Sequence, residues 1–325
     1  MKSFKHFTVN SVGEAVLLLK TYEGRSKIIA GGTDLLGVLK SNILPDYPEA
    51  VVNIKNIKGL DKIESGTDGF LRIGPLVRLK DIICSPLIKE KCPLLATAAE
   101  TVATNEIRNV ATIGGNICQD IRCWYYRYPH AIGGRFDCLR KEKKGPCPAV
   151  KGDNRYNAIM GGKGCFAVCP SDIAVALSVL DGIITLRGPE GEREIGIRDF
   201  YTPLGTVMKS DEIVTEIRSL LPSQGARQSF HKFTLRKPID FAVVSVASLV
   251  SMEGSMCQDA KIALGGVSHK PVRAQEAEQT MRGNVPEEAL TAAAAEAALK
   301  GAKPLSKNAY KIEIAKTLIK KSLLL

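Results

Sequence analysis

Six of the nine cysteines lie in one stretch of about fifty residues, at Cys118, Cys123, Cys138, Cys147, Cys165 and Cys169. Thiolates bind metals, and four of them around one metal centre would hold an irregular loop in place. The spacing leaves three interpretations open, namely an iron–sulfur cluster, a structural zinc site and reduced structural thiols. Zinc sites usually use tightly spaced cysteine pairs, whereas the only short gaps here are Cys118–Cys123 and Cys165–Cys169. The irregular spacing therefore favours an iron–sulfur cluster over zinc.

The stretch around these cysteines is basic and aromatic. Residues 122–163 contain ten Lys or Arg against three Asp or Glu, so they carry +7 of the chain's net charge of +11. They include the only tryptophan, Trp124, and much glycine and proline, without helical or strand periodicity. Such an excess of charge could face nucleic acid, steer an acidic protein or balance an anionic cluster. No helix-turn-helix, zinc-finger or RNA-binding signature accompanies it, so nucleic acid is the least favoured partner.

Two pairs of adjacent glycines could bind phosphate groups. The first is in Ala30-Gly31-Gly32-Thr33-Asp34-Leu35, and the second is in Ala111-Thr112-Ile113-Gly114-Gly115-Asn116. An apolar run precedes the first pair, which predicts a buried strand, a turn and a helix capped by Thr33 or Asp34. Backbone amides at such turns can hold phosphate, and two turns could face a single dinucleotide. Neither segment has the glycine pattern of the nicotinamide-binding fold.

The hydrophobic pattern predicts the elements that must position these residues. We expect strand–helix–strand units in residues 1–60, a second region over 61–221, a linker, and a third region over 227–325. The predicted elements are a helix over 15–20, strands over 28–30, 51–54 and 71–73, a helix over 92–102, strands over 243–250 and 261–264, and helices over 287–300 and 309–323.

Composition excludes several classes of protein. Hydrophobic residues make up 45% and charged residues 24% of the 325 residues, which is typical of a globular protein. No apolar run reaches the ~18 residues of a membrane span, and no secretion signal is visible. An odd cysteine count without such a signal indicates a reducing compartment, so we expect a cytoplasmic protein without membrane contact. We expect Cys84, Cys92 and Cys257, which lie outside the cysteine-rich stretch, to be buried thiols.

Motifs along nearly the whole chain resemble those of one protein family. They are the two glycine segments over 30–35 and 107–116, Ser171-Asp172-Ile173-Ala174, the segment 230–242 that begins Phe230-His231-Lys232-Phe233, and Ala263-Leu264-Gly265-Gly266-Val267. In this order they are similar to the flavin-binding medium subunit of the molybdenum hydroxylases. This family includes xanthine dehydrogenase, aldehyde oxidase and carbon monoxide dehydrogenase.

The resemblance implies an α+β fold and bound FAD. It implies a two-lobed FAD-binding domain of the vanillyl-alcohol-oxidase type over 1–221, with lobes over about 1–60 and 61–221 and a cysteine-rich loop over about 118–165. A smaller C-terminal α/β flavoprotein domain over 227–325 would follow. The FAD pyrophosphate would bind the first glycine turn, formed by Ile29, Ala30, Gly31, Gly32, Thr33, Asp34, Leu35 and Leu36. Thr112, Gly115 and Asn116 would close over the other side, Asp172 would bind ribityl or ribose hydroxyls, and Lys232 would lie near the isoalloxazine.

The insertion narrows the resemblance to the flavin subunits of 4-hydroxybenzoyl-CoA reductases, which carry an extra [4Fe-4S] cluster at this point. The resemblance implies Cys123, Cys138, Cys147 and Cys165 as the ligands, with Cys118 as a neighbour. Cys165 is preferred to Cys169 because it precedes the Asp172 segment at the matching distance.

The resemblance also implies a function in electron transfer, with no catalytic residue in this chain. Electrons from an acidic ferredoxin would enter at the cluster, pass to FAD, and continue to a 2Fe-2S small subunit and a molybdopterin-containing large subunit. There 4-hydroxybenzoyl-CoA would be reductively dehydroxylated, in a complex expected to be a dimer of heterotrimers. The alternative within the family is the FAD subunit of a xanthine, aldehyde or aromatic hydroxylase. A remote alternative is a nucleic-acid-binding protein whose basic loop is held in place by bound zinc.

Overall fold

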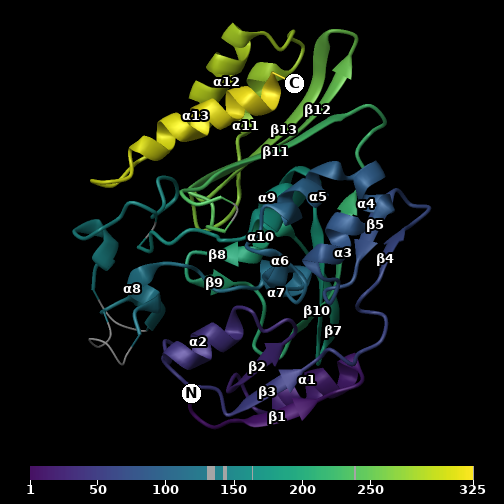
Figure 1. Ribbon diagram of the computed structural model, residues 1–325, viewed down its shortest axis with the longest axis vertical. Helices are drawn as coiled ribbons and strands as arrows, with labels where there is room; N and C mark the ends of the chain where they lie inside the picture. Colours follow the sequence, from purple (N-terminus) through teal and green to yellow (C-terminus); the bar gives the residue numbers. More distant parts are fainter. Residues whose placement is uncertain (130–135, 142–144, 163, 238, 325) are drawn as a thin grey trace.

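The computed structural model describes residues 1–129, 136–141, 145–162, 164–237 and 239–324. Three sheets follow one another along the long axis of the molecule, from the N-terminal strands at one end to the C-terminal helices at the other (Figure 1). The chain is therefore a mixed α/β protein, and each sheet has its own set of covering helices.

The first sheet is parallel and small. Its strands β1 (Lys5–Thr8), β3 (Ala50–Asn53) and β2 (Ser26–Ile29) lie in that order. Parallel neighbours need crossover connections, and these contain α1 (Val12–Thr21) and α2 (Leu35–Ser41). The predicted helix over 15–20 and strands over 28–30 and 51–54 are confirmed to within a few residues. The first glycine turn lies between the end of β2 and the start of α2.

The second sheet is antiparallel. Its strands are β4 (Ile63–Ser65), β5 (Phe70–Ile73), β10 (Ile213–Leu220), β6 (Ile183–Gly188) and β7 (Gly191–Gly196), in that order. A separate two-stranded ribbon pairs β8 (Tyr201–Thr202) with β9 (Gly205–Thr206). The helices of this region are α3 (Leu79–Cys84), α4 (Pro86–Lys91), α5 (Pro93–Glu100), α6 (Asn105–Arg108), α7 (Ile113–Ile117), α9 (Asp172–Val179) and α10 (Ile197–Phe200). Every residue of α9 is buried, so this helix forms the centre of the largest hydrophobic core.

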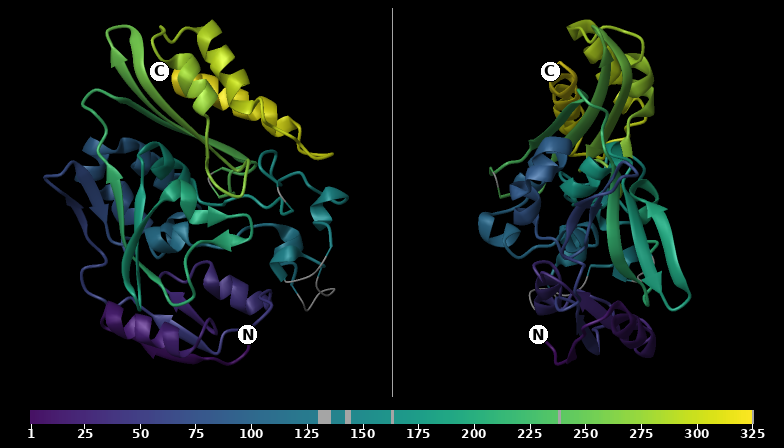
Figure 2. Two further views of the ribbon diagram at one scale, coloured as in Figure 1. Left: turned by 180° about the vertical axis from the view of Figure 1, so that it is seen from behind. Right: turned by 90° about the vertical axis from the view of Figure 1, so that its right-hand side faces the viewer.

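The third sheet lies between two groups of helices. Its antiparallel strands are β11 (Arg227–Phe233), β12 (Val244–Glu253), β13 (Met256–Gly265) and β14 (Val272–Arg273). Side chains alternate along β12, so that Val244 and Val246 pack into the C-terminal core while Ala247 and Leu249 pack into the core around α9. The outer face is covered by α11 (Gln275–Met281), α12 (Glu288–Leu299) and α13 (Tyr310–Leu323) (Figure 2).

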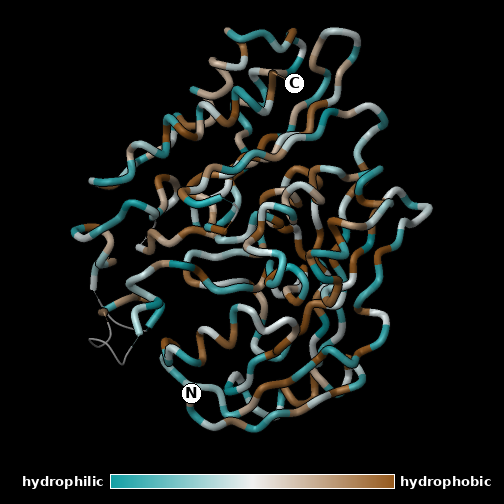
Figure 3. Tube along the Cα trace, viewed as in Figure 1, coloured by the Kyte–Doolittle hydropathy of each residue, from teal (hydrophilic) through white to brown (hydrophobic). Residues whose placement is uncertain are grey.

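Apolar residues are concentrated in the interior elements, whereas hydrophilic residues prevail on the outer loops (Figure 3). Within the described residues, no helix combines the length and the apolar character that crossing a membrane requires. Cys92 and Cys257 are buried, as expected. The same expectation for Cys84 was wrong, because this thiol ends the short helix α3 on its solvent side and is exposed.

The cysteine loop, residues 118–165, has little regular structure where it is described. It contains α8 (Trp124–Arg127) and two short 3-10 helices, η2 (Leu139–Lys141) and η3 (Pro148–Val150). Polar contacts fix its returning arm to the C-terminal segment. Asn308 Nδ2 donates to the Asn157 carbonyl over 3.0 Å, and Asn154 Nδ2 donates to Ser306 Oγ over 3.1 Å. The loop is therefore held by buried side-chain contacts in place of secondary structure.

Lys311 makes the stability of this junction depend on pH. Its ammonium is fully buried and donates to the carbonyls of Asn157 and Gly266, and burial lowers its pKa to about 7. Between about pH 7 and pH 10 the unfolded chain binds more protons at this lysine than the folded chain does, so the free energy of unfolding should rise with pH. The slope from this group approaches about 1.4 kcal/mol per pH unit. Denaturation midpoints of the wild type and of Lys311→Met, measured from pH 6 to pH 10, should diverge; parallel curves would contradict this assignment.

Candidate functional site

The first glycine turn approaches the second glycine segment closely. A Cβ added to Gly31 would lie 2.4 Å from the carbonyl oxygen of Val110, and Gly32 has a φ of +72°. Only glycine fits the first contact, and glycine is favoured at the second position because its backbone is left-handed. The two segments are thus neighbours, as the prediction of one shared ligand requires.

The second glycine segment is the start of a helix, which corrects the expected turn. Thr112 is the N-cap of α7, and its Oγ1 accepts a hydrogen bond from the Gly115 amide over 3.2 Å. A Cβ on Gly114 would lie 2.9 Å from the Pro75 carbonyl oxygen, so glycine is needed here for close packing. Asn116 Oδ1 accepts from Ser171 Oγ over 2.6 Å and ties this helix to the start of α9. The short helix escaped sequence analysis because glycine disfavours helices and the capping residue was not recognised.

A cavity of about 820 Å³ lies between the first and second sheets and extends to the edge of the third. Its size is within the range of roughly 300–1,000 Å³ that small-molecule and cofactor sites occupy. Twelve of the thirteen residues predicted to bind FAD line it: Ile29, Ala30, Gly31, Gly32, Thr33, Asp34, Leu35, Thr112, Gly115, Asn116, Asp172 and Lys232. The thirteenth, Leu36, is absent from the lining and half-exposed. Residues from four separate parts of the sequence therefore face one space.

Asp172 and Lys232 form a buried ion pair in this wall. Lys232 Nζ lies 2.8 Å from Asp172 Oδ2, both side chains are 5% exposed, and the ammonium also donates to the Thr101 carbonyl. The family resemblance implies separate contacts of the two residues with FAD, and their pairing with each other is not visible in the sequence. The pair joins α9 to β11, and it leaves the second carboxylate oxygen of Asp172 without a lysine contact.

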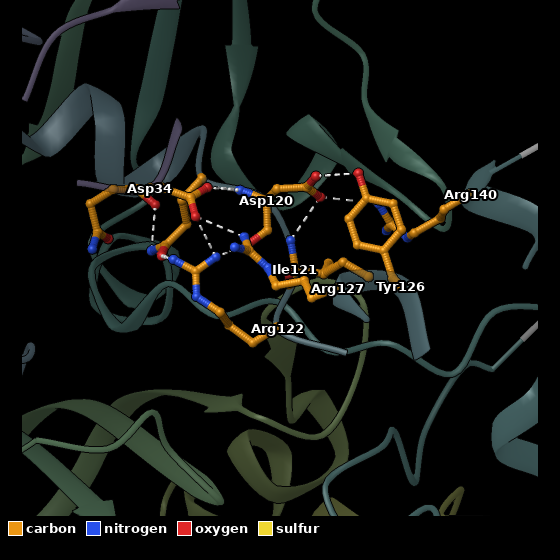
Figure 4. A network of polar contacts seen from close by, with 9 residues as sticks. Asp34, Asp120, Ile121, Arg122, Tyr126, Arg127 and Arg140 are labelled. Carbon is orange, nitrogen blue, oxygen red and sulfur yellow. Dashed lines mark hydrogen bonds and ion pairs between the residues drawn. The ribbon is translucent and has the colours of Figure 1, made fainter. Parts of the chain in front are cut away.

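Asp34 has a different role from the helix cap that the sequence suggests. It occupies the N-cap position of α2, but its side chain makes no capping hydrogen bond. Its Oδ1 instead pairs with Arg122 and Arg127, each over 2.7 Å, in the cysteine loop (Figure 4). Both arginines line the cavity. The summed charge of the loop does not single out these two arginines in the sequence.

The four predicted cysteine ligands are neighbours in the structure. Cys138 and Cys165 belong to one small buried cluster, with Cys123 packed against it. Burial raises the pKa of Cys123, and the nearby thiols of Cys147 and Cys138 raise it further. The pKa of Cys138 is likewise raised by burial, and the thiols of Cys165 and Cys147 act in the same direction.

Donors surround these thiols, which suits an anionic group. The backbone N–H groups of Tyr126 and Tyr125 oppose the rise in the pKa of Cys123, and the Arg140 amide opposes that of Cys138. The buried Lys141 ammonium acts on Cys138 in the same sense. Among the described residues, no three His, Cys, Asp or Glu side chains are arranged as a metal site. The thiols are thus gathered, and the groups that donate to them are of the kind that a cluster of thiolates needs.

Cys118 and Cys169 lie in different surroundings from the other four thiols. Both pack in the main core, and burial raises the pKa of each to about 12. Cys169 also has the Tyr201 hydroxyl as a hydrogen-bond partner.

Two protein-family models match the chain, one after the other, and together they span nearly all of it. The FAD binding domain in molybdopterin dehydrogenase matches residues 2–223, and the CO dehydrogenase flavoprotein C-terminal domain matches residues 228–325. The chain belongs to this family of FAD-binding oxidoreductase subunits.

Individual relatives of this flavin subunit agree with the family match. Aldehyde oxidoreductase FAD-binding subunit PaoB of Escherichia coli (strain K12) is 33% identical, over 97% of this chain and 96% of its own length. The carbon monoxide dehydrogenase medium chain of Hydrogenophaga pseudoflava is 28% identical, over 98% and 96%. A solved carbon monoxide dehydrogenase from Hydrogenophaga pseudoflava has a TM-score of 0.79 at 25% identity, covering 99% of this chain and 96% of that one. Quinoline 2-oxidoreductase from Pseudomonas putida shares the fold, with a TM-score of 0.78 at 23% identity.

Removing one partner of the buried ion pair should destabilise the flavin subunit strongly. Lys232→Met leaves the carboxylate of Asp172 buried without its cation, and such a loss costs about 3–5 kcal/mol. Replacing both residues, as Lys232→Met with Asp172→Leu, should restore most of that stability because no charge is then stranded. Urea denaturation of the full chain measures both variants. A single variant within about 1 kcal/mol of the wild type would show that water reaches the pair freely.

Proposed function

We propose that this chain carries electrons between FAD and the other redox groups of a molybdenum hydroxylase complex. The observation that supports this most is the cavity, because twelve of the residues predicted to bind FAD, from both glycine segments and from the positions of Asp172 and Lys232, line one space. When bound, FAD exchanges electrons both in pairs and singly, which links substrate oxidation to one-electron carriers. The residues of this chain would bind and orient it. The chain offers no nucleophile or general base for substrate chemistry in this proposal.

The partners follow from this proposal. We infer a molybdopterin-containing large subunit, where the substrate reacts, and a 2Fe-2S small subunit that passes electrons to FAD, in a dimer of heterotrimers. The relatives are named for oxidising aldehydes and carbon monoxide. That favours an oxidative hydroxylase, with an aldehyde as the first substrate to test, over the reductive dehydroxylation of 4-hydroxybenzoyl-CoA. Electrons would then leave the complex through this subunit, the opposite direction to the one expected for the reductase.

We also propose that Cys123, Cys138, Cys147 and Cys165 hold a [4Fe-4S] cluster. Their mutual proximity, the amide donors around Cys123 and Cys138, and the buried Lys141 all fit an anionic group. Four thiolates would bind the cluster, and the surrounding donors would stabilise its charge.

The charge of the loop supports local balance more than long-range steering of a ferredoxin. Arg122, Arg127, Arg140 and Lys141 turn inward and make contacts within the protein, whereas Lys151 and Arg155 are exposed. Arg135, Lys143, Lys144 and Lys163 lie outside the described residues. An acidic ferredoxin as the external partner therefore stays a prediction, and binding that weakens steeply with salt would support it.

Anaerobic reduction of the assembled complex tests the proposed function. With all three subunits present, an aldehyde should bleach the FAD absorbance. The isolated chain should show no bleaching, because the substrate site lies in the large subunit. A complex whose flavin is reduced by an acidic ferredoxin but never by aldehydes would favour the dehydroxylase. Bleaching of the isolated chain by an aldehyde would contradict the proposal that the substrate reacts in the large subunit.

A further inference from the structure

A network of ion pairs joins the first glycine turn to the cysteine loop. Asp34 Oδ1 binds Arg122 Nη1 and Arg127 Nη2, and Asp34 Oδ2 accepts from the Asp120 amide over 2.8 Å. Arg122 and Arg127 lie on either side of Cys123 in the sequence. The segment that bears Cys123 is thus fixed to the glycine turn by a single carboxylate (Figure 4).

Asp120 extends the network to the second cysteine segment. Its Oδ2 accepts from the Tyr126 hydroxyl over 2.5 Å, and its Oδ1 pairs with Arg140 Nη1 over 3.8 Å. Arg140 follows Cys138 by two residues, and its guanidinium donates to the carbonyls of Pro203 and Leu204. Two acidic side chains therefore connect the glycine turn with the segments of both Cys123 and Cys138.

The local structure around Asp34 indicates that these long-range contacts determine its orientation. An aspartate at an N-cap usually contributes about 1 kcal/mol by bonding a free amide of its own helix. The backbone of Asp34 is helical, with φ −100° and ψ −53°, whereas a capping residue is normally extended, and its side chain makes no capping bond. Its carboxylate instead reaches Arg122 and Arg127, 88 and 93 residues along the chain. The carboxylate is therefore committed to the loop and not to its own helix.

Burial makes the loop sensitive to this carboxylate. The side chains of Asp34, Arg122 and Arg127 are 17%, 23% and 21% exposed. Without Asp34, two guanidiniums would face each other in a poorly hydrated place. The segment over 120–127 would then have to open toward water.

We propose that Asp34 and Asp120 are positioning residues that couple the filling of the flavin cavity to the geometry of the cysteine loop. This inference rests on the proposed function, since FAD is the ligand that fills the cavity. The cavity is lined by the glycine turn and equally by Asp120, Arg122, Arg127 and Arg140. A ligand whose diphosphate binds the amides of the turn fixes the backbone of Asp34, and the carboxylate then fixes the loop. Coupling of this kind is reciprocal, so an ordered loop tightens FAD binding by the same factor.

Hydrogen–deuterium exchange of the full chain tests the coupling without requiring iron. In the wild type, saturating FAD should slow amide exchange over 120–128 and 136–141 by about tenfold or more. In Asp34→Asn the same amides should exchange rapidly, and FAD should change their rate less than about twofold. Asp34→Glu keeps the carboxylate and should restore most of the protection. Asp68→Asn removes an exposed aspartate that also binds an arginine, Arg72, outside the cavity lining, and should behave as the wild type.

The opposite end of the ion pair gives a second variant in case Asp34→Asn fails to fold. Arg127→Gln should abolish the protection as Asp34→Asn does. In the double variant the loop amides should exchange no faster than in either single variant. FAD bound to each variant is counted from its absorbance after gel filtration. A wild-type chain that retains no FAD overturns both the proposed function and the coupling. A chain that binds FAD and protects the loop equally well in Asp34→Asn overturns the coupling alone.

Discussion

Replacing Gly31 with alanine is expected to weaken FAD binding roughly 5- to 150-fold, the effect of about 1–3 kcal/mol of overpacking at the cavity wall. The new methyl group would lie 2.4 Å from the Val110 carbonyl oxygen and 3.0 Å from the Ala111 Cα. Both are backbone atoms, so no side chain can rotate away. The two glycine segments would have to separate, and both of them line the space that FAD must fill.

Gly13→Ala is the matched control for this variant. Gly13 lies in α1 of the same lobe, outside the cavity lining, and its added Cβ would meet only Ser11 Oγ at 4.0 Å. Alanine is favoured over glycine in helices, so this variant should be as stable as the wild type or more so. FAD affinity is measured by quenching of flavin fluorescence. An affinity of Gly31→Ala within twofold of the wild type would contradict the assignment of the glycine turn to FAD.

Replacing Cys165 with serine is expected to remove nearly all iron from the chain, because a [4Fe-4S] cluster needs four protein ligands. Cys165 shares a buried cluster with Cys138, and its thiol influences the pKa of Cys138. Serine is a far poorer iron ligand than a thiolate. The iron content of the purified protein, with the charge-transfer absorbance of the cluster, measures the loss.

Cys169→Ser is the control for the cluster. Cys169 packs in the main core beside the Tyr201 hydroxyl, so serine finds a hydrogen-bond partner there and the iron content should not change. Loss of iron in Cys169→Ser with retention of iron in Cys165→Ser would show that Cys169, and not Cys165, is the fourth ligand. Full iron in both variants would contradict the four-cysteine assignment.

The sequence allowed the elements with strong periodicity to be predicted well. Helices α12 and α13 were predicted to within a few residues because each buries one regular face. Strand β12 is buried on both faces and was predicted equally well, because its residues are mostly apolar, with several β-branched valines. The short helices α3, α4 and α6 and the central helix α9 were not foreseen. Helix α9 is apolar on all sides because it is enclosed by the core, so its periodicity carries no signal.

The candidate site was predicted in part. The glycine turn was found because adjacent glycines after an apolar run report directly on backbone conformation, whereas Asp172 was found through the family resemblance. The pairing of Asp172 with Lys232, and that of Asp34 with Arg122 and Arg127, connects residues 60 and about 90 positions apart. Such contacts are fixed by tertiary packing, and no local sequence pattern indicates them. The inward direction of Arg140 and Lys141 was hidden for the same reason, since composition gives the sum of charges and not their orientation.

The ultraviolet–visible spectrum of the purified full chain, prepared without oxygen and with FAD, iron and zinc counted per polypeptide, tests the central claim most directly. The account predicts one FAD per chain, about four irons, and a broad absorbance that overlaps the flavin bands. FAD without iron would leave an FAD-binding subunit whose cysteine loop holds no cluster. A chain that binds zinc and no FAD would contradict the assignment of the cavity and of the electron-transfer function.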